Sequence, residues 1–132
     1  MTGSVHAVTA PRVFDGVAVH EDAAVVIDGP RIAAVMPRAE LPAAIPLREF
    51  GDDTWLAPGF IDIQVNGGGD VLFNDEPTPD GARAILAAHR KFGTTALLPT
   101  LVSDTAEKMT AALAAVEALA GVEPGVLGIH LE

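Results

Sequence analysis

The chain has 132 residues, of which 49% are apolar, 20% are charged and 5% are aromatic. This length corresponds to one domain or two small ones, because a typical domain has about 100–200 residues. The apolar content excludes a disordered chain, and no apolar run reaches the roughly 18 residues that a transmembrane helix needs. Eight basic and eighteen acidic residues give a net charge of −10, which disfavours binding to nucleic acid or anionic membranes.

The sequence contains no cysteine, which excludes disulfides and thiol catalysis. Its N-terminus lacks a basic stretch followed by an apolar run, so no secretory signal is expected. We therefore expect a soluble, cytoplasmic protein that binds neither nucleic acid nor membranes.

Short β-strands are predicted for residues 1–57. Residues 13–19 place apolar residues around a turn signal, residues 23–27 and 31–35 are expected strands, and residues 50–56 are expected to hold one more short strand. Two of them flank Asp28-Gly29-Pro30, a pattern that is typical of a β-hairpin. We expect Pro30 to lengthen that loop beyond two residues, because proline cannot donate a hydrogen bond to the ladder.

From Pro58 onward the pattern changes to strands that alternate with helices. The three expected strands lie in residues 60–65, 95–98 and 126–131, and Pro99 is expected to close the second. Strands joined by helices pair in parallel through right-handed crossovers. A complete (β/α)8 barrel needs about 250 residues. Residues 58–132 are therefore either a small three-stranded α/β unit or the first part of a larger barrel.

Helix-boundary residues place two helices between these strands. Thr78-Pro79 is typical of an N-cap followed by the first helical residue, and Gly93 is expected to end that helix. The second helix is expected to begin after Ser103 or Asp104 and to end at Gly121.

Polar residues alternate with apolar ones on the first and third of these strands. Parallel strands covered on both faces are normally continuous apolar runs, whereas here one face of each strand is polar. Ligand sites of barrels and open α/β sheets lie at the carboxyl ends of the strands, so a polar site is expected there. The polar-face residues are Asp62, Gln64 and Asn66 on the first strand, and His130 and Glu132 on the third.

Each of these residues also has a purely structural interpretation. Asp62 can bond backbone groups, and Gln64 and Asn66 can bond loop amides. His130 can be an interior histidine with its hydrogen bonds satisfied, and Glu132 can be a solvated side chain.

Three segments resemble the N-acetylglucosamine-6-phosphate deacetylases of the amidohydrolase superfamily. They are residues 55–67, which include P-G-F-I-D, residues 92–100, which include G-T-T-A-L-L-P-T, and the final G-I-H-L-E of residues 128–132. The resemblance implies that residues 1–57 are a β-rich segment of the family's small β-sandwich domain. It implies that residues 58–132 are the first three strands and two helices of its (β/α)8 TIM barrel, which is incomplete in this chain.

The resemblance makes Glu132 a metal ligand. It places Gln64 and Asn66 where many amidohydrolases carry a His-x-His pair, and it assigns Asp62 and His130 a supporting role beside the ligands. Amide oxygens are poorer zinc ligands than imidazole, so the resemblance implies one divalent metal ion, Zn²⁺, rather than two.

The implied reaction is the metal-dependent hydrolysis of N-acetyl-D-glucosamine 6-phosphate to glucosamine 6-phosphate and acetate. The small-molecule partner is thus an amino-sugar phosphate, and the full-length family is expected to be homodimeric. The family's two metal-binding histidines and its catalytic aspartate lie beyond the H-L-E motif. We therefore expect no catalytic residue among these 132 residues, and no activity from them alone.

Two alternatives remain at this stage. One is another amidohydrolase, either dihydroorotase-like or deaminase-like, although such enzymes usually need the His-x-His pair that this sequence lacks. The other is a truncated, non-catalytic remnant that acts as a sugar-binding or interaction module. Such a remnant would expose strand edges and apolar surfaces and should therefore associate.

Overall fold

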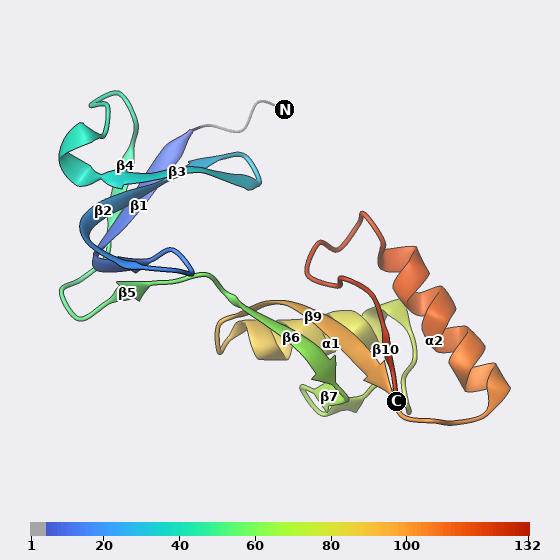
Figure 1. The fold of residues 1–132 in the computed structure, drawn as a ribbon. Coiled ribbons are helices and arrows are strands. Elements are labelled where there is room, and N and C mark those ends of the chain that lie inside the picture. The colour runs from blue at the N-terminus through green and yellow to red at the C-terminus, as the bar shows by residue number, and fades with distance from the viewer. Residues whose placement is uncertain (1–4) are drawn as a thin grey trace. The chain divides into compact units, whose positions relative to one another are not determined.

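The computed structural model describes residues 5–132 and divides the chain into two compact units, Met1–Pro58 and Gly59–Glu132. The first unit consists of strands and one short 3-10 turn, and the second mixes strands with two α-helices (Figure 1). The expected mixed α/β class and the β-rich N-terminal segment are confirmed. Neither α-helix of the described residues is long and apolar enough to cross a lipid bilayer.

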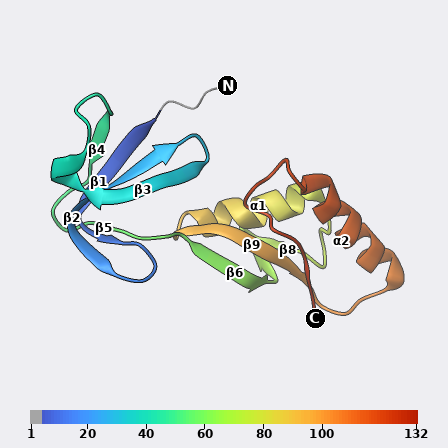
Figure 2. The same ribbon diagram turned by 45° about the horizontal axis from the view of Figure 1, so that its top comes forward.

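A five-stranded sheet forms the first unit. Its strands are β1 (His6–Phe14), β2 (Val19–Asp28), β3 (Arg31–Pro37), β4 (Leu47–Glu49) and β5 (Trp55–Leu56). The order β3-β2-β1 is antiparallel, and β4 and β5 each pair in parallel with β1 (Figure 2). Val13, Ala23 and Val25 form the buried cluster of this unit.

The hairpin expected around Asp28-Gly29 is present, but its loop is shorter than predicted. Only Gly29 and Pro30 connect β2 to β3. Gly29 has a φ of +55°, which suits the first central position of a type II′ turn, and the second position accepts the φ of proline. Pro30 needs no ladder hydrogen bond there, because pairing resumes with Arg31 opposite Asp28.

The second unit contains a three-stranded parallel sheet with helices packed on it. Its elements are β6 (Phe60–Val65), β7 (Gly67–Gly68), β8 (Val71–Leu72), α1 (Pro79–Arg90), β9 (Thr94–Leu101), α2 (Ala106–Leu119) and β10 (His130–Leu131). The strand order is β10-β9-β6 and both pairs are parallel, as predicted. Helix α1 packs along β9, and α2 packs against α1 (Figure 1).

The helix boundaries follow local sequence at most positions. Thr78 caps α1, and its hydroxyl accepts a hydrogen bond from the Gly81 amide at 3.0 Å. The predicted cap of α2 is wrong by one or two residues, because Thr105 caps that helix. The Asp104 carboxylate instead accepts hydrogen bonds from the Thr105 amide, Asn74 and Lys108. Gly121, with a φ of +72°, follows the last residues of α2 as expected.

Two strand predictions need correction. Pro99 does not close the second strand, because β9 continues through it to Leu101. A register shift in β6 between Asp62 and Val65 accommodates this proline, which has no N–H to offer a neighbouring strand. The third strand is shorter than predicted and pairs regularly only at His130–Leu131, with an isolated bridge at Val126.

The core of the second unit lies between the sheet and the two helices. Its fully buried centre includes Phe73, Ile85, Leu86, Leu97 and Leu119. The apolar face of β6 is only partly buried: Val65 is buried, whereas Ile61 and Ile63 are 60% and 66% exposed. These two residues lie on an edge strand of the three-stranded sheet.

Candidate functional site

Two of the sequence-predicted polar residues meet at the carboxyl ends of the strands. Asn66 follows β6 and Glu132 follows β10, and the Asn66 side-chain amide donates a hydrogen bond to Glu132 Oε2 at 3.4 Å. Both strands flank β9, and parallel strands present their carboxyl ends at one edge of the sheet. The topology therefore brings together two side chains that are 66 positions apart in the chain.

The backbone of Glu132 is fixed on both sides by residues of the β9 end. Its amide donates to the Leu101 carbonyl at 3.0 Å. Its carbonyl oxygen accepts two hydrogen bonds from Ser103, from the amide at 2.9 Å and from the hydroxyl at 2.8 Å. Figure 1 accordingly shows the C-terminus beside the carboxyl end of β9. The carboxylate is exposed, so it can reach a ligand.

Asp62 and Gln64 make a local contact instead. The half-buried Asp62 carboxylate accepts a hydrogen bond from the Gln64 backbone amide at 3.2 Å. This is the backbone interaction that the structural interpretation of Asp62 anticipated. The Gln64 side chain is exposed on β6, and it is the backbone of Gln64 that bonds Asp62.

His130 connects the outer strands of the three-stranded sheet. Its Nδ1 lies 2.8 Å from the Ile63 carbonyl oxygen. Because a carbonyl can only accept, Nδ1 is the donor in this contact. His130 is half-buried, and this bond ties β10 to β6 next to Asn66 and Glu132.

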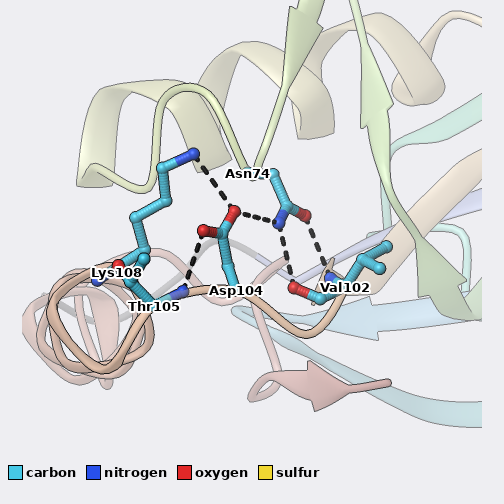
Figure 3. A network of polar contacts seen from close by, with 5 residues as sticks. All are labelled: Asn74, Val102, Asp104, Thr105 and Lys108. Carbon is cyan, nitrogen blue, oxygen red and sulfur yellow. Dashed lines mark hydrogen bonds and ion pairs between the residues drawn. The ribbon is translucent and has the colours of Figure 1, made fainter.

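A polar network that was not expected from the sequence connects Asn74 to the loop after β9 (Figure 3). The Asn74 amide nitrogen donates to the Val102 carbonyl at 2.9 Å and to Asp104 Oδ2 at 3.0 Å. The Asn74 amide oxygen accepts from the Val102 amide at 2.9 Å. Asp104 also accepts from the Thr105 amide at 2.8 Å and from Lys108 Nζ at 3.1 Å.

These contacts favour the ionised form of Asp104. Its pKa is lowered from 3.8 to about 2, chiefly because the carboxylate accepts the hydrogen bond of the Thr105 amide. The hydrogen bonds from Asn74 and Lys108 lower it further. The lowered pKa thus favours a negatively charged Asp104 in the loop that follows β9.

The glycine-rich segment after β6 forms a packed hairpin. Gly67–Gly68 pairs with Val71–Leu72, and His89 Nε2 lies 3.0 Å from the Gly67 carbonyl oxygen. A Cβ on Gly68 would lie 2.8 Å from His89, so this glycine allows the hairpin to approach α1 closely.

The residues present fit part of a metal site. Glu132 offers an exposed carboxylate oriented by a neighbouring amide, and carboxylate oxygens are good ligands of divalent cations. Residues 5–132 contain no group of three or more His, Asp or Glu side chains placed to hold a metal ion. Among the described residues, Glu132 is therefore a candidate for one anionic ligand, and no closed coordination shell is present.

Comparison with known proteins places the chain in a family. Residues 5–51 match the NagA composite domain. The chain is 54% identical over 78 residues to the N-acetylgalactosamine-6-phosphate deacetylase of Shewanella sp. (strain ANA-3), which covers 58% of this chain and 20% of that protein. It is 36% identical over 112 residues to the N-acetylglucosamine-6-phosphate deacetylase of Haemophilus influenzae, covering 84% of this chain and 29% of that protein.

Solved structures give the same family over nearly the whole chain. The N-acetylglucosamine-6-phosphate deacetylase of Pasteurella multocida superposes with a TM-score of 0.88 at 29% identity, over 96% of this chain and 34% of that one. The Mycobacterium smegmatis enzyme, solved as a D267A mutant, superposes with a TM-score of 0.81 at 28% identity, over 98% and 32%. The chain thus spans about a third or less of each relative. It belongs to the N-acetylglucosamine-6-phosphate deacetylase family of the amidohydrolase superfamily and corresponds to the N-terminal portion of these enzymes.

Proposed function

We propose that this chain forms the N-terminal portion of a metal-dependent hydrolase that removes the acetyl group from an N-acetylhexosamine 6-phosphate. In this proposal Met1–Pro58 contributes to the small β-sandwich, and Gly59–Glu132 supplies the first three strands of an incomplete TIM barrel. The observation that carries the proposal is the position of Glu132, which ends the H-L-E motif at the carboxyl edge of the sheet beside Asn66.

The role of each residue follows from its position. Glu132 would hold one divalent cation, for which Zn²⁺ is the candidate. Such an ion, when bound, supplies Lewis-acid polarisation of an acetamide carbonyl. Asn66 orients the Glu132 carboxylate through its amide N–H. His130 keeps the end of β10 close to β6 through the Ile63 carbonyl, and Gln64 lines the same edge from β6.

The alternative of a different amidohydrolase is less well supported. Gln64 and Asn66 stand where a His-x-His pair would be needed, and amides are weak ligands for Zn²⁺. The relatives described above are named deacetylases. The identity of the sugar is a separate question, because the relative with 54% identity acts on the galactosamine derivative according to its name.

A hybrid protein tests the proposal. Residues 1–132 are joined to the part of the Haemophilus influenzae relative that follows its matching segment. We expect acetate release from N-acetylglucosamine 6-phosphate that a chelator abolishes and Zn²⁺ restores. The same assay with N-acetylgalactosamine 6-phosphate, and with a second hybrid built on the Shewanella relative, determines which epimer is preferred.

The Glu132→Gln variant of the hybrid is the informative control. It keeps the size of the side chain but removes the anionic ligand, so metal affinity and acetate release should fall by about 100-fold or more. This is at least the upper end of the 10–100-fold loss caused by altering the hydrogen-bond partners of metal ligands. A folded hybrid that binds Zn²⁺ yet deacetylates neither sugar would refute the proposed function.

A further inference from the structure

Hydrogen bonds connect Asn74 to the loop after β9, and further hydrogen bonds connect this loop to the backbone of Glu132. Asn74 lies between β8 and α1, and its partners Val102 and Asp104 lie in the loop after β9. Figure 3 shows the Asn74 side chain between these partners, with the amide group facing the Val102 backbone. This loop also contains Ser103, the residue that donates two hydrogen bonds to the Glu132 carbonyl.

The orientation of the Asn74 amide is determined by its partners. Its oxygen faces a donor, the Val102 N–H, and its nitrogen faces two acceptors, the Val102 carbonyl and the Asp104 carboxylate. A flipped amide would oppose all three contacts. Both N–H groups of this half-buried side chain are therefore used, and Val102 is held at both its amide and its carbonyl.

The loop is held from its other end as well. Asp104 accepts from the Thr105 amide and from Lys108, which is one turn into α2. Residues 102–104 are thus fixed to the segment before α1 by Asn74 and to the start of α2 by Asp104. Ser103 lies between the two fixed residues, so its amide and hydroxyl are held in place toward the Glu132 carbonyl.

We propose that Asn74 and Ser103 are positioning residues for Glu132: Asn74 fixes the loop after β9, and Ser103 transmits that placement to the metal-binding carboxylate. This inference rests on the proposed function, because it assumes that Glu132 is a metal ligand. Hydrogen-bonded partners that orient metal ligands typically contribute 10–100-fold to metal affinity. Neither Asn74 nor Ser103 needs to touch the metal or the substrate to have this effect.

The test uses the hybrid with the Haemophilus relative and measures Zn²⁺ affinity by competition with a chromogenic chelator. Ser103→Ala and Asn74→Leu should each weaken Zn²⁺ binding by about 10–100-fold. Ser103→Thr retains the hydroxyl and should restore affinity to within about twofold of the parent. In turnover, both damaging variants should lower kcat at saturating Zn²⁺ less than at limiting Zn²⁺.

Thr110→Ala is the matched control. Thr110 is an exposed residue of α2 whose hydroxyl donates to the Ala106 carbonyl at 2.8 Å, the same kind and length of bond that Ser103 makes. Its loss should leave Zn²⁺ affinity unchanged. Far-UV circular dichroism of all variants verifies folding, and Ser103→Ala alters only an exposed hydroxyl, so it remains informative if Asn74→Leu unfolds.

The outcomes separate the two proposals. If Ser103→Ala binds Zn²⁺ as tightly as the parent, or if Thr110→Ala weakens binding equally, the positioning role is wrong while the proposed function stands. If the parent binds Zn²⁺ but deacetylates neither sugar, the proposed function is wrong and the affinity series still decides the positioning role. If Glu132→Gln leaves Zn²⁺ affinity unchanged, Glu132 is not a ligand and the positioning inference fails with it.

Discussion

Replacing Gly81 by alanine should destabilise the second unit, although alanine is normally the better helix former. Gly81 is buried in the first turn of α1. A Cβ at this position would lie 2.3 Å from the Glu76 carbonyl oxygen and 3.2 Å from Glu76 Cγ. The nearer atom belongs to the backbone, so it cannot be relieved by a side-chain rotation.

The magnitude of this destabilisation follows from two unfavourable effects and one favourable effect. Overpacking of a well-packed site costs about 1–3 kcal/mol, and displacing the turn weakens the Thr78 cap on the Gly81 amide, worth about 1 kcal/mol. The intrinsic preference for alanine over glycine returns about 1 kcal/mol. We therefore expect Gly81→Ala to lower the free energy of unfolding by about 1–3 kcal/mol.

Urea denaturation followed by circular dichroism at 222 nm measures this effect, because both α-helices belong to the second unit. With a slope of about 1 kcal/mol per M, the midpoint should fall by about 1–3 M. Ala87→Gly is the matched control at an exposed position of the same helix, and it should cost about 1 kcal/mol. A midpoint that rises in Gly81→Ala would show that the close approach to Glu76 is not a constraint.

Three further predictions follow. The 132 residues alone should release no acetate above background from either sugar phosphate with Zn²⁺ present, and metal-dependent release would overturn this. NMR titration should give Asp104 a pKa of about 2, and Asn74→Leu should raise that pKa. Because the folded-state pKa lies below the ordinary 3.8, the contribution of ionised Asp104 to folding stability is complete above about pH 4 and is lost as the pH falls through about 2. The chain should self-associate through exposed apolar residues, and replacing both Ile61 and Ile63 by lysine should shift it toward monomer in sedimentation velocity; unchanged association would place the contact elsewhere.

Features that depend on neighbouring residues could be predicted from the sequence. The Thr78 hydroxyl bonds an amide three residues away, and the β2–β3 hairpin turns at Gly29 and Pro30, within the expected Asp28-Gly29-Pro30 segment. The parallel order of β6, β9 and β10 follows from their alternation with helices. β4 was missed because its three residues follow a proline-rich stretch that masks so short a strand.

The candidate site was only partly predictable, because some of its contacts join residues that lie far apart in the sequence. Alternation along β6 and the H-L-E motif identified Asn66 and Glu132, which the structure brings into contact. Asn74 gave no such signal, because an asparagine between a short strand and a helix cap is common in loops. Its partners lie 28 and 30 residues away, so only the folded structure shows that it bonds the loop that contains Ser103.

The contacts that orient Glu132 all come from the second unit. Asn66, Leu101 and Ser103 hold its side chain and backbone, and each belongs to Gly59–Glu132. No described residue of the first unit is required for this arrangement. The carboxylate is therefore oriented by hydrogen bonds within the second unit, independently of any residue outside it. In a protein whose remaining ligands come from other strands, such preorganisation would reduce the entropy lost when the metal site closes. For this reason the positioning variants should affect metal affinity more strongly than the unfolding midpoint.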